Sequence, residues 1–548
     1  MKKIFTLAFL AFSTFSQAQF QTIATSTAFE EPENDYAKII CLKNNKTAYL
    51  HVTGEDGINM RLYDANHKEV FSKTIQHELG NFKGLDVDGI FESGGNIVVC
   101  LSVIEKKVPK LYRLVISTAN GDLVKAEQLG ELPKVTMGSQ YAMAFGGVKK
   151  PDFLVRHDED KSYAVALFNT FSSDRSKRIE LIHYDSKNKE TQRVYLSTPG
   201  NKFKYVNILD MVVANNQTIY ALVYGYNTAN SDGNEGQTYI ATIRHGQKNI
   251  DYLPIYDDHG RRSTDGILKY LPSQDHLFVV TQAETGKRSG SFFSNQSSVF
   301  YEILRYQIKV STGQIRELDG LDVSRINQKL TELFGKKSGF TGVLQNFYLN
   351  NDGSSVLIFE GLTVQTTQSS RSMRLSYILG DASIFSFDAN GKMTSAVVVP
   401  KSQILNNTMV FGGGMAVTAG PLDHYRRSNG ATYLKGGNQF KSFSYFHGQT
   451  KDYFLLNDVW ENEENIQRGK LQKIIGVGEC DAFAFLTNGG QTIPNRQFVF
   501  EKPMKKGEHN LAIFTISDFD RKNNVYATLK LTKEGRKKMV QVVWLQPE

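Results

Sequence analysis

The sequence repeats one supersecondary pattern, and this repetition constrains the fold more than any other feature. In the clearest copy, the alternating run 384–387 meets the Asp/Asn/Gly turn 388–392, and the alternation resumes at 393–398. Two strands joined by such a turn form a β-hairpin. Six further copies occur, at 62–67, 115–121, 183–188, 242–246, 308–313 and 529–535. Seven copies of one unit predict a repeat architecture.

A second hairpin precedes each of these turns. The second set of hairpins lies at 43–50, 93–99, 158–165, 214–221, 272–279, 350–358 and 447–455. Each unit therefore holds four strands, named a to d, in an antiparallel meander. We predict an all-β fold, a single β-propeller of about seven four-stranded blades. Further strand-like runs at 482–486, 497–501 and 511–516 make eight blades the alternative.

The units are longer than ordinary propeller blades of about 40–50 residues, and the extra length is unevenly placed. We expect a propeller domain over 19–548 with insertions at 320–341, 400–440 and 458–523. The a–b and c–d turns are short, so the length falls in the b–c connections, among them 363–379, and in the d–a connections. Both kinds open on the same face of a meander. Within the first insertion, 322–335 has the apolar spacing of a helix lying over the disc, with Asp322 as its cap and Gly335 as its end.

Residues 1–18 have the features of a signal peptide. Lys2 and Lys3 precede an apolar run, and Ser16-Gln17-Ala18 forms a small-residue cleavage site. The apolar run is too short to span a bilayer, and no later run is long and apolar enough to do so. We expect a periplasmic protein, with an extracellular location as the alternative. Cleavage lowers the formal charge of +8 by two, and neither this modest excess nor the compartment favours nucleic acid as a partner.

The sequence indicates no catalytic residue, cofactor or metal site, so we favour a protein that is not an enzyme. The triple glycine at 412–414 lacks the Lys-Ser/Thr of a phosphate loop, and the histidines lack zinc-ligand spacing. The acidic pairs in 86–89 and 518–520 offer fewer oxygens than calcium requires. The charged cluster 257–262 is best interpreted as a solvated loop. Three cysteines, Cys41, Cys100 and Cys480, are expected to be small buried hydrophobes.

Arginine and aromatic residues gather in the predicted insertions. Because interface hot spots favour Tyr, Trp and Arg, we hypothesise that these residues form a partner-binding face. The candidates are Arg261, Arg262, Arg288, Phe292, Phe293, Arg371, Arg374, Tyr425, Arg426 and Arg427.

The leader ending in Gln17-Ala18-Gln19, the Asn- and Lys-rich turns and hairpins such as Tyr63-Asp64-Ala65-Asn66 resemble those of exported propeller-like envelope proteins of the Bacteroidota. Among these, the chain is similar in size and class to the plug-type subunit that closes the periplasmic mouth of the type IX secretion translocon. The stretch 526–544 is interpreted as the last two strands of the final blade, which favours retention in the periplasm over surface export.

This resemblance implies a non-enzymatic propeller that binds an envelope or outer-membrane protein, as an accessory or plug subunit of envelope or secretion machinery. The alternative is an envelope hydrolase or a glycan-binding propeller with its pocket on the same face. A deep pocket of converging carboxylates or histidines would favour the alternative, and a broad aromatic and Arg surface would favour protein binding. The oligomeric state is left open.

Overall fold

The structure, a computed structural model, describes most of the chain from Phe20 onward. The described residues are 20–77, 85–134, 136, 151–158, 162–169, 171–215, 217–227, 236–256, 262–285, 300–335, 340, 342–368, 373–410, 432–434, 437–487, 495–503, 507–534 and 537–548.

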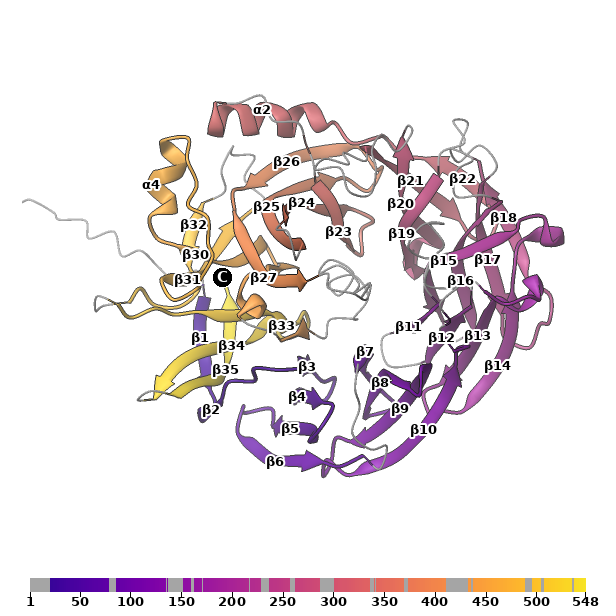
Figure 1. The fold of residues 1–548 in the computed structure, drawn as a ribbon, viewed down its shortest axis with the longest axis horizontal. Helices are drawn as coiled ribbons and strands as arrows, with labels where there is room; N and C mark the ends of the chain where they lie inside the picture. Colours follow the sequence, from indigo (N-terminus) through magenta and orange to yellow (C-terminus); the bar gives the residue numbers. More distant parts are fainter. Residues whose placement is uncertain are drawn as a thin grey trace, which may run out of the picture.

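Eight antiparallel sheets stand around a ring, so the fold is an eight-bladed β-propeller (Figure 1). In each blade strand a lies at the inner side of the ring and strand d at the outer side. Blade one holds β3 (Tyr36–Cys41), β4 (Thr47–Thr53), β5 (Gly57–Tyr63) and β6 (Glu69–Ile75); blade two β7 (Asp86–Ser93), β8 (Asn96–Glu105), β9 (Val108–Ser117) and β10 (Leu123–Glu131); blade three β11 (Asp152–Asp158), β12 (Ser162–Phe168), β13 (Ile179–Asp185) and β14 (Glu190–Leu196); blade four β15 (Tyr205–Ala214), β16 (Thr218–Tyr226), β17 (Gln237–Arg244) and β18 (Asp251–Ile255).

The remaining blades follow the same order, and the last one is completed by the N-terminal strand. Blade five holds β19 (Arg262–Leu271), β20 (His276–Thr285), β21 (Phe300–Lys309) and β22 (Gln314–Glu317); blade six β23 (Gly342–Leu349), β24 (Ser355–Gln368), β25 (Met373–Phe387) and β26 (Met393–Val399); blade seven β29 (Ser444–His447), β30 (Asp452–Val459), β31 (Cys480–Leu486) and β32 (Arg496–Phe498); blade eight β33 (Ala512–Asp520), β34 (Val525–Glu534), β35 (Lys537–Pro547) and β1 (Phe20–Thr25). The indigo strand β1 lies beside the yellow strands of the C-terminus (Figure 1).

The propeller fold and its four-stranded blades are confirmed, but the blade count is eight, the alternative, and not seven. The stretch 458–523 was predicted to be an insertion, which is wrong, because it contains β31, β32 and β33. The hairpin at 529–535 joins b to c of blade eight, and the outer strand of that blade comes from the other end of the chain. A blade built from both ends cannot be counted by following hairpins along the sequence.

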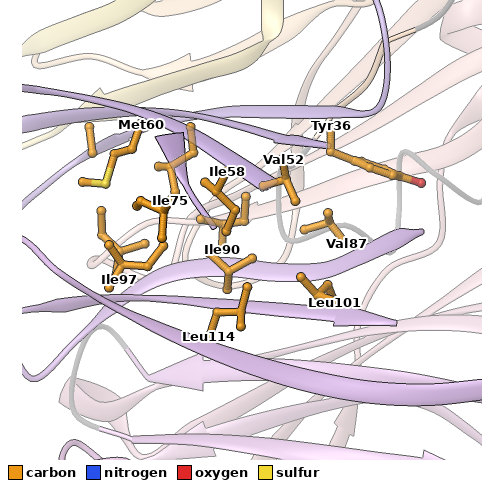
Figure 2. Packing of buried hydrophobic residues seen from close by; sticks show 14 of the residues in the cluster. Tyr36, Val52, Ile58, Met60, Ile75, Val87, Ile90, Ile97, Leu101 and Leu114 are labelled. Carbon is orange, nitrogen blue, oxygen red and sulfur yellow. The ribbon is translucent and has the colours of Figure 1, made fainter. Parts of the chain in front are cut away.

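The hydrophobic core is divided among the interfaces between neighbouring blades. The described residues form eight clusters of buried apolar side chains, one between each pair of blades. Figure 2 shows part of the cluster between blades one and two, where Leu114 and Ile90 face Ile58 and Val52. Both faces of each sheet are therefore buried. The three cysteines are free; Cys100 and Cys480 are buried as expected, and Cys41 is half-buried.

The polar turns form because an aspartate carboxylate takes the place of water at the turn backbone. In blade six Asp388 Oδ1 accepts hydrogen bonds from the N–H groups of Asn390 and Lys392, both at 2.9 Å. Asp64 and Asp185 do the same in blades one and three. Such Asx turns hold a strand-to-strand connection without help from the rest of the fold. This local chemistry explains why the hairpins could be read from the sequence.

Two α-helices and four short 3₁₀ helices lie among the described residues. They are α2 (Val323–Phe334), α4 (Asn462–Gln467), η1 (Arg175–Lys177), η2 (Pro199–Asn201), η3 (Pro272–Gln274) and η4 (Asn438–Phe440). Helix α2 has the expected ends, since Asp322 accepts from the N–H of Ser324 and Gly335 is left-handed at φ 63°. It packs against the outer strand β26 and against α4, at the rim of the ring and not over its centre (Figure 1).

Candidate functional site

The additions to the ring fall in b–c and d–a connections, as expected, and therefore on one face, the insertion face. Helix α2 lies between blades five and six, and α4 joins b to c in blade seven. The connection from blade six to blade seven holds β27 (Gln403–Val410), β28 (Thr432–Tyr433) and η4. Strand β28 pairs with the inner edge of β3, so this connection reaches from blade six to blade one. The opposite face of the ring carries the short a–b and c–d turns, and we call it the turn face.

The most developed addition is a sheet that continues blade six. Beyond Gly361 the hairpin of β24 and β25 continues, from the pair Leu362↔Leu379 to the pair Gln368↔Met373. Strand β27 pairs with the other side of β25. We call these three strands the blade-six extension (362–368, 373–379 and 403–410). The predicted b–c connection 363–379 is therefore mostly strand.

Two glycines at the root of the extension allow its strands to approach closely. The pairing of β24 with β25 shifts from Glu360↔Ala382 to Leu362↔Leu379, so two residues of β25, Gly380 and Asp381, stand opposite Gly361 in a β-bulge. A Cβ atom built on Gly361 would lie 3.3 Å from the Cα atom of Gly380, a distance at which one backbone would have to shift. Bulges of this kind bend a strand pair, so the extension leaves the blade at this point.

A buried ion pair fixes the root. The ammonium group of Lys401 bonds the carboxylate of Glu360 on β24, and both side chains are 1% exposed. The backbone N–H of Lys401 donates to Asp381 Oδ1 on β25 at 3.1 Å. Lys401 thus contacts both strands of the hairpin. Burial raises the pKa of Glu360, and the nearby Lys401 opposes this shift.

Polar contacts join the third strand of the extension to blades seven and eight. The side-chain N–H of Gln403 donates to the carbonyl of Asn457 on β30 at 2.9 Å. Asn457 in turn exchanges hydrogen bonds with the backbone of Ala512 at the start of β33. Buried Lys441 donates from Nζ to the carbonyl of Ile404 at 2.6 Å, and burial lowers its pKa to about 8. The two ends of the insertion 400–440 are therefore part of the packed structure.

Asp381 gives the root a pH dependence. Burial raises its pKa from 3.8 to about 6, so folding takes up a proton between these values and stability falls as the pH rises through this window. Asp381→Asn is expected to raise the free energy of unfolding above pH 6, on the order of 1–3 kcal/mol, because the amide oxygen can still accept from Lys401 N–H. Urea-unfolding midpoints at pH 4 and pH 7.5 check this. An equal gain at both pH values would contradict the assignment to Asp381.

The structure places few of the ten candidate residues. Arg262 begins β19, and Arg374 lies in β25 within the blade-six extension. The side chains of these two, and the other eight candidates Arg261, Arg288, Phe292, Phe293, Arg371, Tyr425, Arg426 and Arg427, lie outside the described residues, as does most of the charged cluster 257–262. In chain order, Arg371 belongs to the connection between the two extension strands. The partner-binding face stays a hypothesis.

The acidic pairs weighed as calcium ligands act as bridges between inner strands. Asp86 accepts from the hydroxyl of Tyr36 in blade one at 2.8 Å, and Asp518 Oδ2 accepts from the N–H of Cys41, also at 2.8 Å. In the same way Asp210 accepts from the N–H of Leu268 in the next blade. These carboxylates satisfy polar groups on or beside inner strands. Within the described part of the chain no group of three or more His, Cys, Asp or Glu could hold a metal ion.

No helix among the described residues is both long and apolar enough to cross a membrane. No protein-family model matches the chain, and no curated protein matches it.

Solved structures resemble the chain at low identity. Dipeptidyl peptidase 4 of Porphyromonas gingivalis has 9% identity and a TM-score of 0.42, over 95% of this chain and 59% of that one. The polysaccharide lyase Uly1 has 9% identity and a TM-score of 0.39, over 87% and 93%. A member of the duf4221 family from Bacteroides vulgatus has 9% identity and a TM-score of 0.33, over 67% and 88%. These similarities assign no activity to this chain.

Proposed function

We propose that this protein is a non-enzymatic, protein-binding propeller of the periplasm, an accessory or plug subunit of envelope or secretion machinery. The observation that carries the proposal is the blade-six extension. It continues the pairing of β24 and β25 past Gly361 on the insertion face and adds β27 beside β25, and a sheet of this kind suits another protein surface more than a small molecule. A small-molecule site is instead a concave pocket that encloses its ligand.

The free-energy cost of the buried ion pair at the root of the extension supports a role in binding. Burying an ion pair removes two charges from water, and an apolar pair of similar size is often as stable or more stable. The Lys401–Glu360 pair is fully buried, and it contacts both strands at the point where they leave the ring. It therefore fixes the direction of the extension at a cost that folding of the ring alone does not require. A fixed direction lowers the entropy lost when a partner binds.

The partner is proposed to be an envelope protein because of the leader at 1–18 and because of the charge of the insertions. The connection 411–431 holds Tyr425, Arg426 and Arg427 with Asp423 as its single acidic residue. Such a segment favours an acidic or aromatic-accepting partner surface, and binding that weakens as the salt concentration rises.

Replacing Tyr425, Arg426 and Arg427 together with Ala tests the proposal. The tagged protein is cross-linked in envelope extracts, and each co-purifying protein is quantified. Truncating hot-spot residues costs about 2 kcal/mol or more each, so recovery of the partner is expected to fall more than about tenfold. The matched control replaces Lys68, Lys189 and Lys392, three exposed cations on c–d turns of the turn face, and should leave recovery unchanged.

Unchanged recovery of every co-purifying protein in the first variant, with the fold intact by circular dichroism, would remove this connection from the binding face. Specific retention of an envelope polysaccharide in place of a protein would instead favour the glycan-binding alternative.

A further inference from the structure

Strand β24 loses its neighbour where the blade-six extension begins. Inside the blade, β23 pairs with β24 up to Gly342↔Gly361. Before Gly342 the chain comes from helix α2. The N–H of Phe340 donates to Asn327 Oδ1 on this helix at 2.7 Å, and its ring packs edge-on against Phe359 at 5.4 Å. In the described residues β23 begins at Gly342, so it pairs no further along β24.

Among the described residues, the stretch Leu362–Gln368 of β24 therefore has one side without a paired strand, which we call the free side. It pairs with β25 on the other side, and no described strand pairs with it beyond Gly361. Along a free side, alternate residues direct their N–H and C=O groups outward in a row that matches an added strand. The root described above holds this row in a fixed position, since Lys401 contacts both β24 and β25.

Within the part of the chain that the structure describes, the free side of β24 lacks the protection seen on the outer strands of blades one to six. Natural sheets block their edges with charged residues, proline or a covering element. The outer strands of blades one to five carry such residues, namely Lys73 in β6, Lys125 in β10, Arg193 in β14, Pro254 in β18 and Arg316 in β22, and the outer strand β26 of blade six is covered by α2. The stretch 362–368 reads Leu-Thr-Val-Gln-Thr-Thr-Gln, which holds neither charge nor proline and is rich in strand-forming residues.

The charge of the hairpin selects the kind of strand that can be added. Residues 362–379 include Arg371 and Arg374 and no Asp, Glu or Lys. Two copies of this hairpin would bring like charges together, which disfavours pairing with a second copy of the chain. An acidic segment gains from the same charges.

We propose that the free side of β24, over Leu362–Gln368, is a docking site at which an extended acidic segment of a partner protein adds as a further strand of the blade-six sheet. This inference rests on the proposed protein-binding function and names its mode. In strand addition, backbone hydrogen bonds supply affinity and alternate side chains supply specificity.

Two synthetic peptides with blocked ends test the site on the full chain without the leader. One alternates Glu and Val over eight residues, and the other alternates Lys and Val. The Glu/Val peptide is expected to slow hydrogen exchange at the amides of Leu362–Gln368. It should bind about tenfold more tightly than the Lys/Val peptide at low salt, with the difference shrinking as salt rises. Methylating alternate backbone nitrogens of the Glu/Val peptide, in the register that pairs, should abolish the protection.

Two neighbouring substitutions supply a matched pair within the protein. In an antiparallel pair, adjacent residues direct their N–H groups to opposite sides of the strand. Of the two variants Val364→Pro and Gln365→Pro, one therefore removes an N–H group that bonds to β25. The other removes an N–H group on the free side alone. The variant that keeps normal exchange protection in β25 should lose peptide binding.

Three results would each overturn the docking site. The Glu/Val peptide could fail to slow hydrogen exchange in 362–368, both peptides could bind equally well, or 362–368 could already be protected in the free protein through self-association. Loss of the peptide effect with continued partner capture through 425–427 would leave the proposed function in place. Peptide binding without any captured partner would support the docking site and contradict the proposed function.

Discussion

Lys401→Met is expected to lower the free energy of unfolding by about 3–5 kcal/mol, because it leaves the carboxylate of Glu360 buried without a counter-charge. Both side chains are 1% exposed, so water cannot replace the lost ammonium group. Burial already raises the pKa of Glu360, and loss of Lys401 raises it further. The folded variant then holds a proton that the unfolded chain releases, so its deficit grows as the pH rises above the ordinary pKa of a glutamate.

The double variant Glu360→Met with Lys401→Met separates the ion pair from the fold. An apolar pair of similar volume should restore stability to within about 1 kcal/mol of the natural protein or exceed it. The control is Arg468→Met, which removes a pair with Glu464 whose side chains are 70% and 68% exposed and should cost less than about 1 kcal/mol. Urea unfolding at pH 5 and pH 8 measures all three. A double variant as unstable as Lys401→Met would show that packing, and not charge, sets the cost.

The architecture was predictable from the sequence because its information is local. Asp64, Asp185 and Asp388 each hold a turn with their own carboxylate, so the signal lies within five residues. The ends of α2 are equally local, since Asp322 and Gly335 act on the neighbouring backbone. These features do not depend on which blades become neighbours.

The blade count and the root of the extension depend on contacts between distant residues. Strand β1 completes blade eight through pairs such as Phe20↔Pro547, and the sequence carries no mark of this partnership. Glu360 and Lys401 lie in different elements and meet only when blade six is folded. One signal was present: Glu360 is a charged residue that ends the apolar run 356–359, and a charge in such a run requires a partner. The sequence could not identify Lys401 as that partner.

The prediction of a plain face and an elaborated face was correct for a topological reason, whereas the predicted nature of two insertions, 363–379 and 458–523, was wrong. The sequence predicts a b–c connection of blade six over 363–379. In the structure the pairing continues to Gln368↔Met373 because β27 supports β25 from the other side. Pairing with β27, a strand distant in the sequence, therefore decides where these two strands end.

Trp544→Ala is expected to destabilise the interface between blades eight and one by about 3–5 kcal/mol, the usual cost of removing a large buried aromatic ring. Trp544 is 1% exposed in the cluster that joins these blades. Its ring meets Tyr63 edge-on at 5.0 Å and stacks on His67 at 4.6 Å. Its Nε1–H donates to Thr47 Oγ1 at 2.9 Å, so the variant also leaves a buried hydroxyl without this partner. This interface closes the ring between the two ends of the chain.

Two control variants locate the effect. Trp544→Phe keeps most of the ring contacts and loses the hydrogen bond, so about 1–2 kcal/mol is expected. Phe385→Ala empties a fully buried site of similar kind between blades five and six and should cost a comparable amount. Hydrogen exchange distinguishes them: Trp544→Ala should expose β5 and β35, whereas Phe385→Ala should expose β21 and β25. If hydrogen-exchange protection in Trp544→Ala fell evenly around the ring, the effect would not be local to the interface between blades eight and one. Closure of the ring would then depend on all eight interfaces together.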